Sequence, residues 1–138
     1  MKYLTNDFAL ELPDSPVQDT TMNLLKFPEL GLTLVVSRAP YEQSSFKESF
    51  DSQLRKMKAS LKGYKIIEQK AVQLPGIGEG LEVINEFVQP PGKVYQVQLA
   101  YQIKNLKEMM VLTYVKTAPI SEEDYLGYMK IRDSILME

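Results

Sequence analysis

The chain is 138 residues long, 44% of them hydrophobic and 25% charged, with a formal net charge of −2. This balance is typical of one globular domain, so we expect a single domain over residues 1–138 and no surface for nucleic acid. Cysteine and histidine are absent. Their absence excludes disulfides, thiol catalysis and histidine-based metal or acid–base chemistry, and we therefore expect neither an enzyme nor a cofactor.

No stretch of the sequence indicates a targeting or membrane segment. The first seven residues, Met1–Asp7, contain no apolar core of a secretion signal. No run of about 18 apolar residues occurs anywhere, so we expect no insertion into a membrane. The expected compartment is the cytoplasm.

Three strands are predicted in the first third of the chain. Phe8–Leu12 alternates apolar and other residues, and Gln18–Phe27 and Leu32–Arg38 follow with a short turn between them. This close spacing favours an antiparallel hairpin. Both strands of the hairpin are apolar on both sides. They are either central and covered twice, or one of their faces stays open for a partner, and the sequence leaves this choice open.

The hydrophobic period then changes to that of a helix. Ser45 and Glu48 have the spacing of a capping box, and Gly63 follows the expected end at Leu61. Gln53 lies at the edge of the apolar stripe. The stripe itself consists of Phe46, Phe50, Leu54, Met57 and Leu61.

The second half of the chain predicts an antiparallel meander and a final helix. In the second of its strands, Leu81 and Val83 lie on one side and Glu82 and Glu86 on the other. Ser121 caps the final helix, with acidic residues in its first turn. The expected strands are Tyr64–Leu74, Leu81–Gln89, Lys93–Lys104 and Glu108–Thr117.

Together these elements predict an α+β fold. One antiparallel sheet of about six to seven strands is expected, with the two helices packed on one of its faces. The other face is then open or covered by a partner.

The strand Lys93–Lys104 has two contrasting faces. One face is aromatic and β-branched and predicts core. The other carries Gln96, Gln98 and Gln102 among small apolar residues. Amides can donate and accept hydrogen bonds at a lower desolvation cost than charges, so this face suits a largely apolar partner with some polar groups. A solvated face that happens to use glutamine is the alternative interpretation.

Two further motifs are best explained structurally. Gly76–Gly80 resembles a phosphate-binding loop, but a strand follows it where such a loop needs a helix. Glu122–Asp124 is explained by the favourable position of negative charge at a helix N-terminus. We therefore expect no catalytic and no metal-binding residues.

Several short motifs, in order along the chain, resemble one known family. They are Phe8-x-Leu-x-Leu-Pro13, Gln18-Asp-x-Thr-Met-Asn-Leu24, Val35-Val-Ser-Arg38, Gln53-Leu54, Leu61-x-Gly63-Tyr-Lys65, Tyr95-Gln-x-Gln98 and Val111-Leu-Thr113. This order resembles the DcrB-like superfamily and, within it, the Eag-type chaperones of bacterial type VI secretion effectors. The resemblance implies a curved antiparallel sheet with helices on its convex side, similar to the PsbP-like fold. It also implies a homodimer that shields the apolar N-terminal, transmembrane-type helices of an effector before export.

The resemblance further implies which positions face the client. They are Met22 or Leu24, Ser37, Gln53 and Gln98, although the family pattern leads us to expect a β-branched residue where Met22 stands. Two other functions stay open: a small-molecule or lipid-binding domain of the same fold, and an immunity protein that binds a folded toxin domain. With two neighbours from the same strands, the candidate partner-binding residues are Met22, Leu24, Val35, Ser37, Gln53, Gln96 and Gln98.

Overall fold

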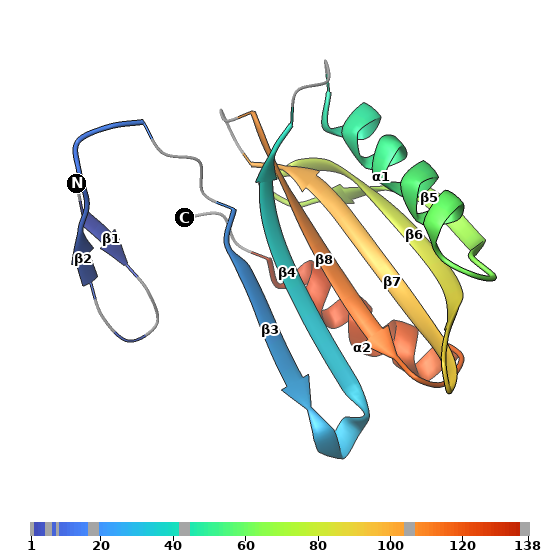
Figure 1. Cartoon of the computed structure of the whole chain (residues 1–138). Helices are drawn as coiled ribbons and strands as arrows, with labels where there is room; N and C mark the ends of the chain where they lie inside the picture. Colours follow the sequence, from blue (N-terminus) through green and yellow to red (C-terminus); the bar gives the residue numbers. More distant parts are fainter. Residues whose placement is uncertain are drawn as a thin grey trace.

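The computed structural model describes residues 2–4, 7, 9–16, 20–41, 45–103 and 107–135. It contains a curved, six-stranded antiparallel sheet, two helices and a separate two-stranded hairpin at the N-terminus (Figure 1). The strand order in the sheet is β3-β4-β8-β7-β6-β5. The expected α+β class and the antiparallel sheet are confirmed.

The strands follow the predicted segments closely. The predicted strand Phe8–Leu12 appears as the short β2, which pairs with an unexpected β1; Phe8, residues 17–19 and Lys104 lie outside the described residues. The strands are β1 (Lys2–Leu4), β2 (Ala9–Glu11), β3 (Met22–Phe27), β4 (Leu32–Pro40), β5 (Lys65–Leu74), β6 (Gly78–Gln89), β7 (Gly92–Gln102) and β8 (Glu108–Lys116).

Strands β5 to β8 form the predicted meander, in which each strand pairs with the next. The turn between β5 and β6 uses Gly76 and Gly78 at φ 73° and 121°, values that favour glycine. Because β6 begins within this turn, it is a hairpin turn and lacks the helix that a phosphate loop requires. The hairpin β3–β4 joins the sheet through β4, which pairs with β8.

Both helices begin at predicted caps. Helix α1 (Phe46–Ser60) starts after Ser45, whose hydroxyl accepts a hydrogen bond from the backbone N–H of Glu48. Helix α2 (Glu122–Asp133) starts after Ser121, which forms a reciprocal capping box with Asp124. Each cap satisfies backbone N–H groups that the helix itself leaves unpaired.

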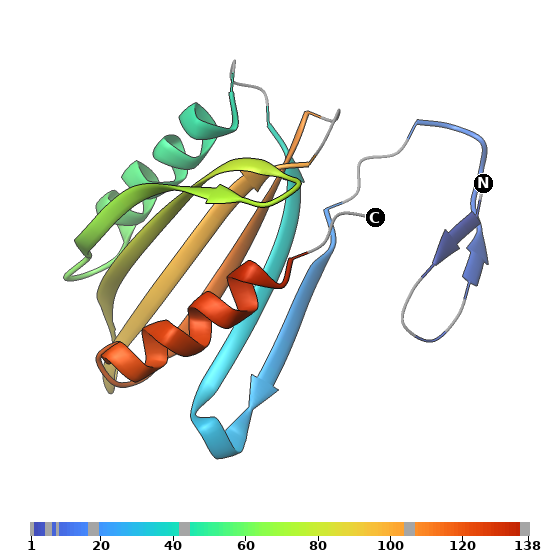
Figure 2. The same cartoon turned by 180° about the vertical axis from the view of Figure 1, so that it is seen from behind.

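The expectation that both helices pack on one face is wrong. Helix α1 packs Phe50 and Leu54 on Val83, Ala100 and Val111. Helix α2 packs Tyr128 on side chains from the opposite face, which in β7 and β8 are Val97, Leu99, Leu112 and Tyr114. Figures 1 and 2 show the two helices on opposite sides of the sheet. The central strands carry apolar residues on both faces, so each face needs a cover of its own.

The hairpin β3–β4 extends the sheet beyond the area that the helices cover. Leu32 and Leu34 of β4 are buried and belong to the core beneath α2. Every residue of β3 is exposed, including Met22 at 66% and Leu24 at 54%. The sequence left open whether these two strands are covered, and the structure answers this for the residues it describes: both faces of β3 are exposed, whereas β4 is buried at Leu32 and Leu34 and half-buried elsewhere.

Candidate functional site

The candidate residues of the strands all lie on one face of the sheet. We call the two faces the α1 face and the α2 face, after the helix that packs on each. In the register of the sheet, Leu24 pairs with Val35, Val35 with Thr113, and Thr113 with Gln98. Paired residues in adjacent strands point to the same face, so these four side chains form a row across β3, β4, β8 and β7 on the α1 face.

Neighbouring rows hold the other candidates of the strands. Met22 pairs with Ser37 and Ser37 with Val111, on one side of this row. Gln96 pairs with Val115 on the other side. The structure therefore brings Met22, Leu24, Val35, Ser37, Gln96 and Gln98 together on the α1 face. Gln53 is exposed on α1 itself, between the buried Phe50 and Leu54.

Helix α1 covers only part of this face. Its buried side chains lie over β6, β7 and the first half of β8, and Figure 1 shows the helix away from β3 and β4. Met22 and Leu24 are exposed, and Val35 and Ser37 are half-buried. The Ser37 hydroxyl donates to the carbonyl oxygen of Val111 at 3.5 Å, a long hydrogen bond. We call this uncovered part of the α1 face, formed by β3, β4 and the second half of β8, the open region.

The inner margin of the open region is a chain of uncharged polar side chains. Asn85 Nδ2 donates to Gln98 Oε1 at 2.9 Å, and Gln98 Nε2 donates to Thr113 Oγ1 at 3.5 Å. Gln98 and Thr113 are buried, and Asn85 is only 1% exposed. Gln98 is thus a partly satisfied amide at the floor of the face.

This chain of amides retains unused acceptors. Asn85 Oδ1 and Gln96 Oε1 are buried and have no hydrogen-bond partner among the described residues. The hydroxyl of Tyr64 is also buried and lies beside the Asn85 side chain: burial raises the pKa of Tyr64, and interaction with the Asn85 side chain lowers it in part. A buried acceptor without a donor costs free energy. Asn85 and Thr113 were not among the candidate residues, because their contact with Gln98 crosses strands that the sequence could not place in register.

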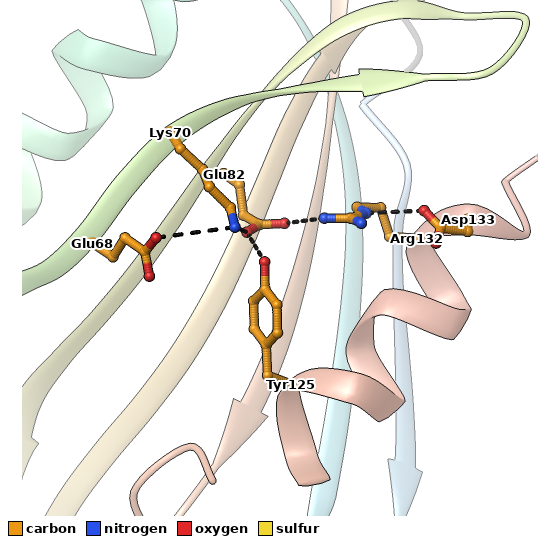
Figure 3. A network of polar contacts seen from close by, with 6 residues as sticks. All are labelled: Glu68, Lys70, Glu82, Tyr125, Arg132 and Asp133. Atoms are coloured by element: carbon orange, nitrogen blue, oxygen red, sulfur yellow. Dashed lines mark hydrogen bonds and ion pairs between the residues drawn. The ribbon is translucent and has the colours of Figure 1, made fainter. Parts of the chain in front are cut away.

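The α2 face buries a charged network (Figure 3). Glu82 is 1% exposed; Tyr125 Oη donates to its Oε2 at 2.5 Å and Arg132 Nη1 donates to its Oε1 at 2.9 Å. Lys70 Nζ lies 3.6 Å from Oε2. Burial raises the pKa of Tyr125, and the Glu82 carboxylate raises it further. Both carboxylate oxygens are occupied, so this cluster holds α2 on the sheet.

Two hollows lie away from the candidate residues of the strands. One, of about 300 Å³, lies between β5, β6 and the start of α2, and its walls include Ile67, Lys70 and Tyr125. The other, of about 180 Å³, lies between α1 and β5, and its walls include Arg55, Tyr64 and Ile66. The first is at the lower end of the volumes that bind small ligands.

Within the described ranges, no group of three or more acidic side chains is arranged to hold a metal ion. Neither helix in that part of the chain has the length and apolar composition needed to cross a membrane.

The fold is shared with a solved protein. A Pseudomonas aeruginosa protein of unknown function, PA94, described as a proposed regulator, superposes with a TM-score of 0.79 at 17% sequence identity. The superposition covers 100% of this chain and 96% of that one. A comparison with curated proteins finds no match. The sequence model of the DcrB family matches residues 8–132, and the chain therefore belongs to the DcrB family.

Proposed function

We propose that this protein is a chaperone, working as a homodimer, that binds apolar, transmembrane-type helices of a client protein and shields them from water. The client class that the sequence resemblance suggests is a type VI secretion effector with such helices at its N-terminus. The observation that carries the proposal is the row Leu24–Val35–Thr113–Gln98, which joins an exposed apolar surface to a polar floor on one face of the sheet.

The open region has the width of one helix. Strands lie about 4.8 Å apart, so β3, β4 and β8 together span about 10 Å. An α-helix with its side chains is roughly 10 Å in diameter. The exposed Met22 and Leu24 offer apolar contacts, and methionine adapts to irregular apolar partners.

The polar side chains at the floor of this face are suited to bind polar side chains of such a helix. A helix satisfies its own backbone internally, but segments that pack in membranes often carry serine or threonine hydroxyls. Those hydroxyls are donors, and Gln96 Oε1 at the margin of the open region is an acceptor to which no described residue donates. Amides can meet them without the desolvation cost of a buried charge.

The test is co-expression with the effector encoded beside this protein, followed by size-exclusion chromatography with mass determination. The effector is compared with and without its apolar N-terminal segment. We expect a complex that is lost when the segment is deleted. A complex that survives the deletion supports binding of a folded toxin domain, and no complex at all redirects attention to a small ligand in the hollow beside Tyr125.

Ser37→Lys is the variant that tests whether the open region binds the client. It places a charge in the open region, and we expect loss of the complex with an unchanged fold by circular dichroism. Ser134→Lys is the control, because the Ser134 hydroxyl also donates to a backbone carbonyl but lies at the end of α2. If Ser37→Lys unfolds the protein, or binds the client as the control does, Ser37 does not belong to the site.

A further inference from the structure

The end of α1 and the start of β5 carry a concentration of positive charge. The segment from Arg55 to Lys65 contains five basic side chains and no acidic one, although the net charge of the whole chain is −2. All five side chains are exposed. They are Arg55, Lys56, Lys58, Lys62 and Lys65, and we call them the basic patch.

The basic patch is not neutralised within the described part of the chain. No carboxylate there lies within ion-pair distance of any of its five side chains. Most other basic side chains of the main sheet and the helices do have such a partner. Those with a partner are Arg38, Lys47, Lys70, Lys93, Lys116 and Arg132.

The helix macrodipole explains only part of this arrangement. Cations are favoured in the last turn of a helix, and Lys58 lies in the last turn of α1. Lys62 and Lys65 lie beyond the end of the helix at Ser60. The backbone N–H of Val88 donates to the carbonyl oxygen of Lys62 at 2.7 Å, which holds the loop against β6. The cations are therefore fixed close together, where they repel one another unless negative charge is bound.

The smaller of the two hollows, between α1 and β5, lies within the basic patch. Its walls combine the cations Arg55 and Lys58 with the apolar Leu54 and Ile66, and Asp51 is the acidic residue among them. Its volume of about 180 Å³ is below the roughly 300 Å³ at which sites for free small molecules begin. A single apolar side chain, presented by a longer segment, suits this hollow better.

The edge of the sheet beside the hollow selects against apolar strands. Among the described strands only β6 pairs with β5, which is the last strand of the main sheet. The register of β5 shifts between Ile66 and Glu68, and Lys65 and Lys70 add positive charge to the strand. Irregular register and lysines discourage the pairing of an edge with another apolar strand. They do not discourage an extended segment that carries carboxylates.

We infer that the basic patch binds an extended acidic segment of a partner protein, with carboxylates on Arg55, Lys58 and Lys62 and an apolar side chain in the hollow. Charge complementarity and the small hollow together favour this occupant. A flat anionic membrane would meet the same cations but leave the hollow unfilled. The sequence pI of about 5.3 is far from that of a domain that binds nucleic acid. This surface lies apart from the open region, so the inference does not depend on client binding.

The experiment is fluorescence anisotropy of the full chain with a short labelled peptide, rich in glutamate, that has one central leucine. The same peptide with glutamine in place of every glutamate is the control ligand. We expect only the glutamate peptide to bind, and its Kd to rise with salt because exposed charges are screened. A peptide with serine in place of the leucine should bind at least about threefold more weakly, because it leaves the hollow without an apolar side chain.

Two double variants locate the binding site. Arg55→Gln combined with Lys58→Gln removes both cations of the hollow. Lys26→Gln combined with Lys130→Gln is the matched control, because it removes the same charge at exposed positions of β3 and α2. We expect the Kd for the glutamate peptide to rise about tenfold in the first variant and to stay within about twofold in the control.

Four outcomes overturn the inference. They are no binding of the glutamate peptide, equal binding of the glutamine peptide, equal binding of the serine peptide, and a test variant that binds as the control variant does. Vesicles of phosphatidylserine and phosphatidylcholine are tested in parallel. Binding to these vesicles without binding to the peptide would assign the basic patch to a membrane surface and also overturn the inference.

Discussion

Two polar side chains of β6, Glu82 and Asn85, are each 1% exposed, and they lie on opposite faces of the sheet. Glu82, on the α2 face, is held by Tyr125, Arg132 and Lys70. On the α1 face, Asn85 donates to Gln98, and its own side-chain oxygen has no hydrogen-bond partner in the described part of the chain.

The difference follows from the cost of burying charge. A buried carboxylate is tolerated only with paired cations and hydrogen bonds, so the cluster around Glu82 has to be complete within the monomer. Burying an amide costs less free energy than burying a charge, so amide oxygens on the α1 face can remain without a hydrogen-bond donor. This contrast supports a structural role for the first cluster and motivates the binding role proposed for the second.

The largest expected loss of stability follows from a change in the charged cluster around Glu82 on the α2 face. Arg132→Met leaves the Glu82 carboxylate without its closest cation, and we expect the free energy of unfolding to fall by about 3 kcal/mol. Urea denaturation at neutral pH measures the change. The control is Lys130→Met, an exposed position of the same helix, which should change stability by less than about 0.5 kcal/mol. A loss below about 1 kcal/mol for Arg132→Met would remove the contrast between the faces.

A smaller effect is expected when the amide chain is interrupted. Gln98→Leu keeps most of the side-chain volume but leaves Asn85 Nδ2 and Thr113 Oγ1 without this partner. We expect a loss of about 1–2 kcal/mol, measured by the same denaturation series. A loss equal to that of Arg132→Met would show that a buried amide and a buried charge cost the same free energy when they lose a partner.

The cap of α2 provides a pH-dependent comparison. Hydrogen bonds from Ser121, helped by Lys116, hold the pKa of Asp124 below its ordinary value of 3.8. Since the folded pKa is the lower one, the stabilisation is present above the ordinary pKa and is lost as pH falls through the lowered one. We expect Asp124→Asn to cost about 1 kcal/mol at pH 7 and progressively less in acid. A difference that is independent of pH between 7 and 2 would contradict a role for the charge.

The smallest expected effect is at the unfilled acceptor. Gln96→Leu removes a buried side-chain carbonyl oxygen that has no partner among the residues the structure describes, so the free energy of unfolding should stay within about 0.5 kcal/mol or rise slightly. Client binding should weaken in the same variant, measured by co-purification. A clear loss of stability would show that Gln96 already has a structural partner, and the site would lose one of its acceptors.

Local patterns were sufficient to predict most elements of the fold. The alternation in β7 separated the buried Val97, Leu99 and Tyr101 from the amides, and serine caps marked the start of both helices. Period-2 alternation also grouped Gln96 with Gln98 on one face, because it depends only on strand geometry.

Features that depend on contacts between distant segments could not be predicted. The alternation of one strand does not show which helix covers which face, so the placement of α2 opposite α1 was missed. Glu82 was expected on the polar side of its strand, but its burial depends on Arg132, which is fifty positions later in the chain. The row from Leu24 to Gln98 likewise requires β4 to pair with β8, a contact that no local pattern encodes.

The pairing of β4 with β8 also affects how the chain is made. Leu32 meets Lys116 and Pro40 meets Glu108, so the β3–β4 hairpin finds its place in the sheet only after β8 has been synthesised. At ribosomal rates of about 5–20 residues per second, roughly 70 residues of delay correspond to several seconds. During that interval an apolar hairpin is present without its neighbour. This protein, which we propose shields apolar segments of a client from water, therefore exposes an apolar segment of its own during synthesis.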